Sequence, residues 1–169
     1  FEKALKLGAD IIVNTDADNQ YDQNEITRLV KPILDRKADI VNGNRQVHLH
    51  KHMGIKRNLN RIGTKFVQTM AGYKIKDASS GFRAYSREAA LRLFIVGGHT
   101  YTHQTLIQAG HKNLKVLEIP VTFKKRNGKS KLITSVTSHI RKSIASITRV
   151  TLMYNSLRTL GYLGSILIL

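Results

Sequence analysis

Residues 9–41 read ADIIVNTDADNQYDQNEITRLVKPILDRKADIV, and this stretch predicts the fold class. The run at residues 11–13 is short and β-branched, which is typical of a buried parallel strand. Asp22 and Glu25 fit a capping box, and apolar residues recur on one face of the helix that follows: Ile26, Leu29, Val30, Ile33 and Leu34. A second short strand follows at residues 38–41. Strand, helix and strand at this spacing predict a βαβ unit in an α/β fold.

The flanking sequence extends this unit in both directions. We expect a helix over residues 1–7 that stops at Gly8, and an amphipathic helix over residues 55–72 marked by Ile55, Leu59, Ile62, Phe66, Val67 and Met70. Further helices are predicted from Ser86 and over residues 102–109, the latter stopping at Gly110. Residues 114–123 alternate and contain Pro120, which favours an edge strand. Basic stretches at 45–57 and 126–132 are expected to be loops.

Charge is distributed unevenly along the 169 residues, whose formal net charge is +17. Residues 1–40 carry six bases and eight acids, whereas the remainder carries 22 bases and three acids. An acidic head and a basic body indicate a bound cation near the first and phosphates or anionic lipid near the second. Nucleic acid is the alternative partner for such a charge. The chain has no cysteine, which excludes disulfides and thiolate chemistry.

The C-terminal part has a different character. Residues 133–158 combine an apolar stripe with basic residues, which is typical of an amphipathic helix in the headgroup layer of a membrane. An ordinary surface helix packed on the core is the alternative. Residues 159–169 carry no charge and are rich in Leu and Ile, so we expect the start of a transmembrane helix there. Because the chain opens without Met and stops inside this apolar run, we expect it to be an internal piece of a longer protein.

The strongest chemical signal follows the first strand. Asp16, Asp18 and Gln20 offer oxygen ligands at alternating positions, at the sheet edge where ligands of open α/β folds bind. Mg²⁺ or Mn²⁺ held there would neutralise a nucleotide diphosphate as the leaving group. Two alternatives remain open from the residues alone: solvated acidic residues capping the next helix, and the aspartyl nucleophile of a phosphatase.

Three further groups of residues could contact a substrate. Arg45 follows the second strand, and Arg57 and Arg61 share a helix face on which two guanidiniums can clamp one phosphate. Residues 77–83, DASSGFR, place Asp77, Ser80 and Arg83 around Gly81, either as a site or as a tight turn with an internal ion pair. The third group is a basic loop that resembles a diphosphate lid, with Arg126, Ser130 and Lys131. His48, His50 and His52 alternate but have no carboxylate or Cys partner nearby in the sequence.

Four stretches in this order resemble glycosyltransferase family 2, of the dolichol-phosphate mannose synthase and bacterial polyprenyl-phosphate glycosyltransferase type. They are GADIIVNTDADNQY, ADIVNGNRQ, DASSGFRAYSREAA and TYTHQTLIQAGHKNLKVLEIPVTFKKRNGKSKL. The resemblance implies a GT-A (Rossmann-like) fold. It further implies inverting transfer of a sugar from a UDP- or GDP-sugar donor to a polyprenyl phosphate, either dolichyl or undecaprenyl. It places the protein at a membrane, the bacterial inner membrane or the endoplasmic reticulum, with the active site facing the cytoplasm.

The resemblance also implies a role for each site residue. Asp16, Asp18 and Gln20 would hold the metal, and Asp18 with Asp77 and Arg83 would form the catalytic centre between donor and acceptor. The substrate-binding residues would be Arg45, Arg57 and Arg61 on the lipid phosphate, Ser80 beside them, and Arg126, Ser130 and Lys131 on the donor diphosphate. Residues 1–132 would then be a partial catalytic domain. It would lack the N-terminal strand that grips the nucleoside, so the fragment alone is expected to be inactive.

Two positions depart from the family pattern. Gln104 stands where relatives usually carry Glu, and Asn60 stands where they usually carry Ser. A catalytically impaired scaffold is therefore one alternative reading. A basic nucleic-acid-binding domain is another, although the cations are split between loops and aromatic platforms for base stacking are sparse. A homo-oligomer stays open.

Overall fold

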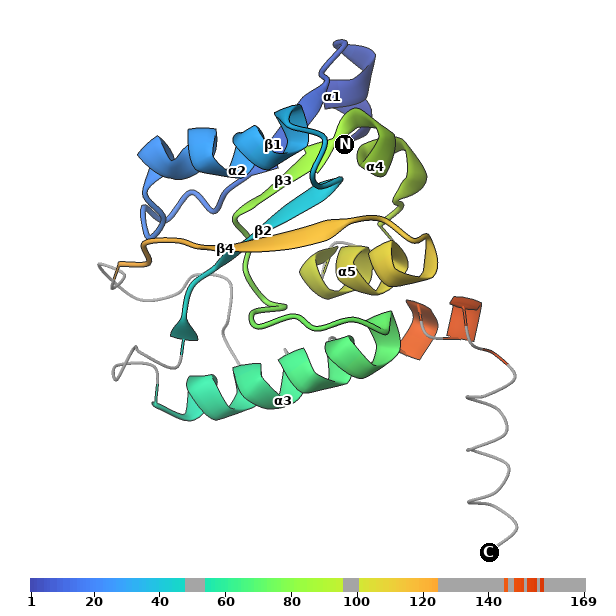
Figure 1. The fold of residues 1–169 in the computed structure, drawn as a ribbon. Helices are drawn as coiled ribbons and strands as arrows, with labels where there is room; N and C mark the ends of the chain where they lie inside the picture. Colours follow the sequence, from blue (N-terminus) through green and yellow to red (C-terminus); the bar gives the residue numbers. More distant parts are fainter. Residues whose placement is uncertain are drawn as a thin grey trace, which may run out of the picture.

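The computed structural model describes residues 1–47, 54–95 and 101–124, together with 145, 148–150, 152–154 and 156. Within them a four-stranded mixed sheet is covered by helices (Figure 1). In chain order the elements are α1 (Glu2–Lys6), β1 (Ile11–Asn14), the 3₁₀ turn η1 (Gln23–Glu25), α2 (Ile26–Leu34), β2 (Ile40–Asn44), α3 (Gly54–Ala71), β3 (Arg83–Ser86), α4 (Arg87–Arg92), α5 (Tyr101–His111) and β4 (Val116–Pro120). The α/β fold class predicted from the sequence is confirmed.

The strand order is β1-β3-β2-β4, and it differs from a simple βαβ unit. The strand β3 lies between β1 and β2 and is antiparallel to both, whereas β2 and β4 are parallel. The expectation that β1 is a buried parallel strand is therefore wrong for its pairing within the described residues, and its four residues are only half-buried. The β4 strand has the predicted edge position, where Pro120 removes no hydrogen bond from a central ladder.

The two faces of the sheet pack against different helices. The α2 helix covers one face, where Leu29 and Ile33 join Val41, Phe82 and Ala84 in a buried cluster. The α5 helix covers the other face, and α3 packs on α5 as an outer layer (Figure 1). This arrangement directs the loops after β1 and β2 and the loop before β3 toward one region of the molecule.

Local sequence signals set most helix ends. Gly8 and Gly72 adopt φ values of +81° and +77°, so both act as the predicted helix stops. Ser86 caps α4, because its Oγ accepts the backbone N–H of Ala89 at 3.1 Å. Asp22 also caps its helix, but it accepts from Asn24 N–H across the 3₁₀ turn rather than in the spacing of a capping box.

Gly110 does not stop its helix. The helix α5 continues through it to His111, and Gly110 is the point where α5 crosses the end of α3. A Cβ at Gly110 would overlap the carbonyl oxygen of Ala71 and lie 2.7 Å from its carbonyl carbon. The glycine therefore serves close helix packing and not chain reversal.

Part of the predicted juxtamembrane segment packs on the core. Residues 145, 148–150, 152–154 and 156 are helical, and Val150 is fully buried in a cluster with Val67 and Leu106. The ring of Tyr154 stacks on that of His111 with centroids 4.8 Å apart. Among the described residues there is no helix of the length and apolarity needed to cross a membrane. Residues 159–169, the predicted start of a transmembrane helix, lie outside the described part.

Candidate active site

Two carboxylates follow the end of β1, as the sequence predicts. Asp16 is exposed and lies against Gly81, because a Cβ built there would be 2.7 Å from Asp16 Oδ2. Asp18 is half-buried, and its Oδ1 accepts the backbone N–H of Gln20 at 3.2 Å. The contact at Gly81 brings the predicted metal residues together with the loop before β3, which carries Asp77 and Ser80.

Gln20 and Tyr21 fasten this segment to its surroundings. The Nε2 of Gln20 donates to the carbonyl oxygen of Lys124 at 3.0 Å, and the backbone N–H of Lys124 donates to the carbonyl of Gln20. The hydroxyl of Tyr21 lies 3.4 Å from Ser80 Oγ and accepts the N–H of Gly81 at 3.3 Å. Burial raises the pKa of Tyr21, so its hydroxyl keeps its proton at neutral pH. Tyr21 thus ties Ser80 and Gly81 to residues 16–20, the predicted metal segment.

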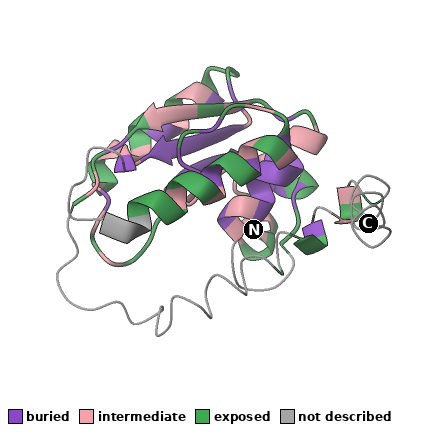
Figure 2. Cartoon of the chain, turned by 90° about the horizontal axis from the view of Figure 1, so that it is seen from below, coloured by how far each residue is buried: buried purple, intermediate pink, exposed green. Residues whose placement is uncertain are grey.

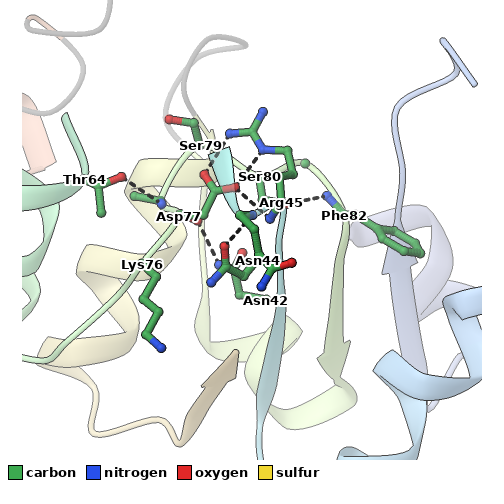
Figure 3. Close-up of polar contacts among 12 residues, drawn as sticks. Asn42, Asn44, Arg45, Thr64, Lys76, Asp77, Ser79, Ser80 and Phe82 are labelled. Atoms are coloured by element: carbon green, nitrogen blue, oxygen red, sulfur yellow. Dashed lines mark hydrogen bonds and ion pairs between the residues drawn. The ribbon is translucent and has the colours of Figure 1, made fainter. Parts of the chain in front are cut away.

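Arg45 and Asp77 form a buried, bidentate ion pair (Figure 3). The Nε of Arg45 lies 2.7 Å from Asp77 Oδ2, its terminal nitrogen lies 2.8 Å from Oδ1, and its backbone N–H also donates to Oδ2. The exposed fractions of the two side chains are 12% and 1%. Burial alone would raise the pKa of Asp77, but the hydrogen bonds and charge of Arg45 outweigh it and hold that pKa below its ordinary value. Asp77 is therefore ionised, and both of its carboxylate oxygens accept hydrogen bonds from Arg45.

A row of polar side chains crosses the four strands of the sheet next to this pair. The sequence pattern did not predict this row. The strand registers align Asn14, Arg83, Asn42 and Glu118 on neighbouring strands. The Nδ2 of Asn42 donates to Glu118 Oε1 at 2.9 Å and to the carbonyl of Asp77 at 2.9 Å. Glu118 also accepts the backbone N–H groups of Lys76 and Asp77, at 2.6 and 3.1 Å. Glu118 therefore holds the loop that carries Asp77.

Arg83 occupies the centre of this row and is fully buried. Its Nε donates to Asn42 Oδ1 at 2.6 Å, and its terminal nitrogens donate to the carbonyls of Ala78 and Thr102 and to Thr105 Oγ1. Among the described residues this guanidinium has no carboxylate in an ion pair with it, and its hydrogen bonds offset much of the desolvation cost. The arrangement suits shaping the site through the loop and α5, whereas a direct contact between Arg83 and substrate stays a prediction.

Arg57 and Arg61 line a cavity beside the Arg45–Asp77 pair. The cavity has a volume of about 670 Å³ and also receives Lys65 and Lys76, so its lining among the described residues includes four cations and no acid. Neutral lining residues include Asn44 and Thr64. Thr64 Oγ1 accepts the N–H of Ala78, which joins α3 to the same loop (Figure 3). A cavity lined by cations and amides is suited to a phosphate-bearing ligand.

The remaining residues that the sequence singles out either lie outside the described part of the chain or are buried in α5. Arg126, Ser130 and Lys131 lie outside the described residues, as do His48, His50 and His52. Gln104 is fully buried in α5, one residue after His103, whose Nε2 lies 3.2 Å from Ser79 Oγ. Within residues 1–47, 54–95 and 101–124 no three His, Asp or Glu side chains gather in a metal-binding cluster.

The family follows from a match over this same region. The family model described as "Glycosyl transferase family 2" matches residues 5–94, which run from the end of α1 through α4. The chain belongs to glycosyltransferase family 2. The match includes the predicted metal segment (residues 16–20), Arg45, Arg57, Arg61 and the 77–83 loop, so these candidate residues lie within the matched region.

Relatives of this family 2 chain include several enzymes named for lipid-phosphate acceptors. UDP-N-acetylglucosamine–dolichyl-phosphate N-acetylglucosaminyltransferase of Methanococcus voltae is 31% identical over 127 residues, covering 71% of the chain and 50% of that protein. Undecaprenyl-phosphate mannosyltransferase of Micrococcus luteus is 26% identical over 157 residues, covering 88% and 63%. The low-salt glycan biosynthesis hexosyltransferase of Haloferax volcanii is 30% identical, covering 75% and 32%. The chain therefore spans between about a third and two thirds of the length of these relatives.

Solved structures confirm the GT-A-like fold. Glucosyl-3-phosphoglycerate synthase from Mycobacterium tuberculosis, in complex with Mn²⁺, UDP and phosphoglyceric acid, superposes with a TM-score of 0.67 at 16% identity. The match covers 85% of the family 2 chain and 49% of that enzyme. At this identity the likeness concerns the fold alone.

The donor set of the family 2 chain fits a divalent metal. Mg²⁺ is commonly held by one or two carboxylates together with substrate phosphates and water, and Asp16 and Asp18 supply two carboxylates on one short segment. Asp16 approaches Gly81 so closely that a Cβ there would lie 2.7 Å from Asp16 Oδ2, so the present position of the carboxylate depends on glycine at residue 81. The ligand role of Gln20 stays a prediction.

Proposed function

We propose that the protein transfers a sugar from a nucleoside-diphosphate sugar to a polyprenyl phosphate, with inversion, at a membrane surface. The observation that carries the proposal is the shared loop 77–83. Its Gly81 contacts the metal carboxylate Asp16, and its Asp77 pairs with Arg45 beside the cationic cavity. A donor diphosphate at Asp16 and an acceptor phosphate at the cavity would therefore lie on two sides of one loop.

The acceptor side supports a phosphate nucleophile. A phosphate monoester is already anionic near neutral pH, so it needs cations for positioning more than a base for deprotonation. The cavity supplies those cations through Arg57, Arg61, Lys65 and Lys76. A hydroxyl acceptor would instead need a general base. Asp77 suits that task poorly, because Arg45 occupies both of its oxygens and lowers its pKa.

The reaction is a single displacement at the anomeric carbon. An acceptor phosphate oxygen forms the new C–O bond, while the bond from that carbon to the donor diphosphate breaks and its electron pair leaves with the nucleoside diphosphate. A divalent metal held by Asp16 and Asp18, with Gln20 as a further ligand, would neutralise the charge on the departing diphosphate. Arg57 and Arg61 would hold the acceptor phosphate, and Arg126, Ser130 and Lys131 would contact the donor. Ser80 is fully buried beside the hydroxyl of Tyr21, so it would act on the site through the loop.

The named activities of the relatives support this assignment at the level of substrate class. A dolichyl phosphate and an undecaprenyl phosphate each stand in the name of a relative at 31% and 26% identity. Membrane association with the site facing the cytoplasm belongs to the same proposal. Because this chain spans 50% and 63% of these two relatives, we expect the 169 residues alone to be inactive and the full-length protein to carry the transfer.

The test uses the full-length protein in detergent with Mn²⁺, a panel of labelled UDP- and GDP-sugars and a polyprenyl phosphate. We expect label in the lipid fraction that disappears with chelator and with Asp18→Ala. The matched control is Asp35→Ala, an exposed carboxylate at the far end of α2. Activity retained in Asp18→Ala would refute the metal assignment. Donor hydrolysis without lipid labelling would refute the acceptor, and absence of donor binding would favour the scaffold alternative.

A further inference from the structure

The residues that follow β4 form a short segment, 121–124, whose side chains alternate in burial. In Figure 2 the central strands of the sheet are coloured as buried, whereas the edge strands are mainly intermediate or exposed. Beyond the edge strand β4, Val121 is buried and Phe123 is half-buried, while Thr122 and Lys124 are exposed. Phe123 therefore faces the protein, and its two neighbours in the chain face solvent.

Hydrogen bonds join this segment to two parts of the candidate site. The N–H of Val121 donates to the carbonyl of Asn44 at 3.0 Å, next to Arg45 in the chain. The N–H of Lys124 donates to the carbonyl of Gln20 at 2.8 Å, and Gln20 Nε2 donates to the carbonyl of Lys124 at 3.0 Å. The segment is thereby fixed to the end of β2 and to the predicted metal segment.

The ring of Phe123 lies next to a side chain from each of these parts. Its centroid is 5.2 Å from the ring centroid of Tyr21 and 5.3 Å from the central carbon of the Arg45 guanidinium. An aromatic ring within about 6 Å attracts a guanidinium to its face. The ring accomplishes this without taking up the Nε and terminal nitrogen that Arg45 donates to Asp77.

Tyr21 and Arg45 hold the 77–83 loop at two different points. Arg45 binds Asp77 at the first residue of the loop, and the hydroxyl of Tyr21 accepts the N–H of Gly81 at 3.3 Å. The same aromatic ring is next to both of these side chains. A change at the ring would therefore act on the loop at both points together.

Apolar packing is the simpler role for a large side chain at this position. Phe123 does pack on a buried cluster that includes Leu29, Val41 and Phe82. A leucine would satisfy that packing to a large extent, because it is apolar and fills a good part of the same volume. Leucine has no aromatic face for the guanidinium, so the two roles can be separated by substitution.

We propose that Phe123 is a positioning residue of the transferase, whose ring keeps Arg45 and Tyr21 in place on the 77–83 loop. It thereby holds the acceptor side of the site in register with the predicted metal side. The kinetic part of this inference rests on the proposed function, whereas the contact between the ring and the guanidinium does not. Phe123 itself contacts no substrate in this proposal.

The kinetic test compares Phe123→Leu with Phe123→Tyr in the full-length protein, using donor, Mn²⁺ and a polyprenyl phosphate. The matched control is Phe94→Leu at the end of α4, because Lys112 Nζ lies 5.1 Å from the centroid of that ring. We expect Phe123→Leu to lower kcat about 5-fold, the contribution of one such ring–cation contact, and to leave both KM values unchanged. Phe123→Tyr keeps the ring and should restore kcat, and Phe94→Leu should match the parent.

A second measurement needs no turnover. In protein labelled with ¹⁵N-arginine, the Nε–H signal of Arg45 is identified by its absence in Arg45→Lys. We expect this proton to exchange with water about 5-fold faster in Phe123→Leu than in the parent, and at the parent rate in Phe123→Tyr and Phe94→Leu.

The two measurements together separate the inference from the proposed function. Unchanged exchange in Phe123→Leu would overturn the contact, whether or not the protein transfers sugar. Faster exchange with unchanged kcat in an active protein would leave Phe123 a packing residue and overturn its positioning role, as would a Phe123→Tyr variant as slow as Phe123→Leu. A parent that transfers no sugar to any lipid phosphate would contradict the proposed function instead, and the exchange rate would still decide the contact with Arg45.

Discussion

Two glycines in helices of this protein predict opposite responses to the same substitution. Gly110 lies inside α5 against Ala71, whereas Gly63 lies inside α3 with nothing within 4 Å of the position its Cβ would take. Alanine is favoured over glycine in a helix interior by about 1 kcal/mol. Gly63→Ala should therefore raise the free energy of unfolding by up to about 1 kcal/mol.

Gly110→Ala gains the same helical preference and loses more through overlap. The new Cβ would meet main-chain atoms of Ala71, which cannot move aside by changing a rotamer, so α3 and α5 must separate. Overpacking of this kind costs about 1–3 kcal/mol or more, and we expect a net loss of about 2 kcal/mol. Urea unfolding followed by circular dichroism measures both variants against the parent. Equal stability of the two variants, or a Gly110→Ala protein at least as stable as the parent, would refute the close α3–α5 contact.

Three further predictions concern the site. Gly81→Ala should displace Asp16, so that the Mn²⁺ concentration for half-maximal activity of the full-length protein rises while the circular dichroism spectrum stays unchanged. Asp77→Asn should leave Arg45 buried without its counter-charge and cost about 3 kcal/mol or more in urea unfolding. Because Arg45 lowers the pKa of Asp77, the carboxylate stabilises the fold above the ordinary Asp pKa, and this contribution is lost as the pH falls through the lowered one; Asp77→Asn should flatten that acid limb. Glu118→Gln should lower kcat more than it raises the KM of the donor, since Glu118 acts through the backbone of the Asp77 loop, and Glu118→Asp should restore part of the loss.

The sequence predicts most elements of the fold because their signals are local. The caps at Ser86 and Asp22 and the stops at Gly8 and Gly72 depend on side chains and backbone angles within one turn. The sequence also singles out residues 16–20 and the 77–83 loop as candidate site segments, and their roles stay predictions. Their contact at Gly81 confirms that the two segments meet.

The strand order was not predictable in the same way. The central strand β3 has only four residues and begins with Arg83, so its pattern does not resemble a buried strand. It can occupy the middle of the sheet because Asn42, Thr105 and two backbone carbonyls satisfy that guanidinium. These partners come from distant parts of the chain, and no local rule predicts them. The exposure of Leu59, Ile62 and Phe66 on α3 was also not predictable from the sequence, since periodicity identifies a shared face but not what that face contacts.

The position of β1 has a practical consequence for handling the protein. Within the described residues, β1 pairs with β3 on one side, and its other edge has no strand beside it. Its sequence, Ile-Ile-Val-Asn, combines high β-propensity with no charge, which makes an open edge a template for strands of other molecules. Recombinant preparations of these 169 residues should therefore form β-rich aggregates that bind thioflavin T, and a peptide strand added against β1 should suppress them.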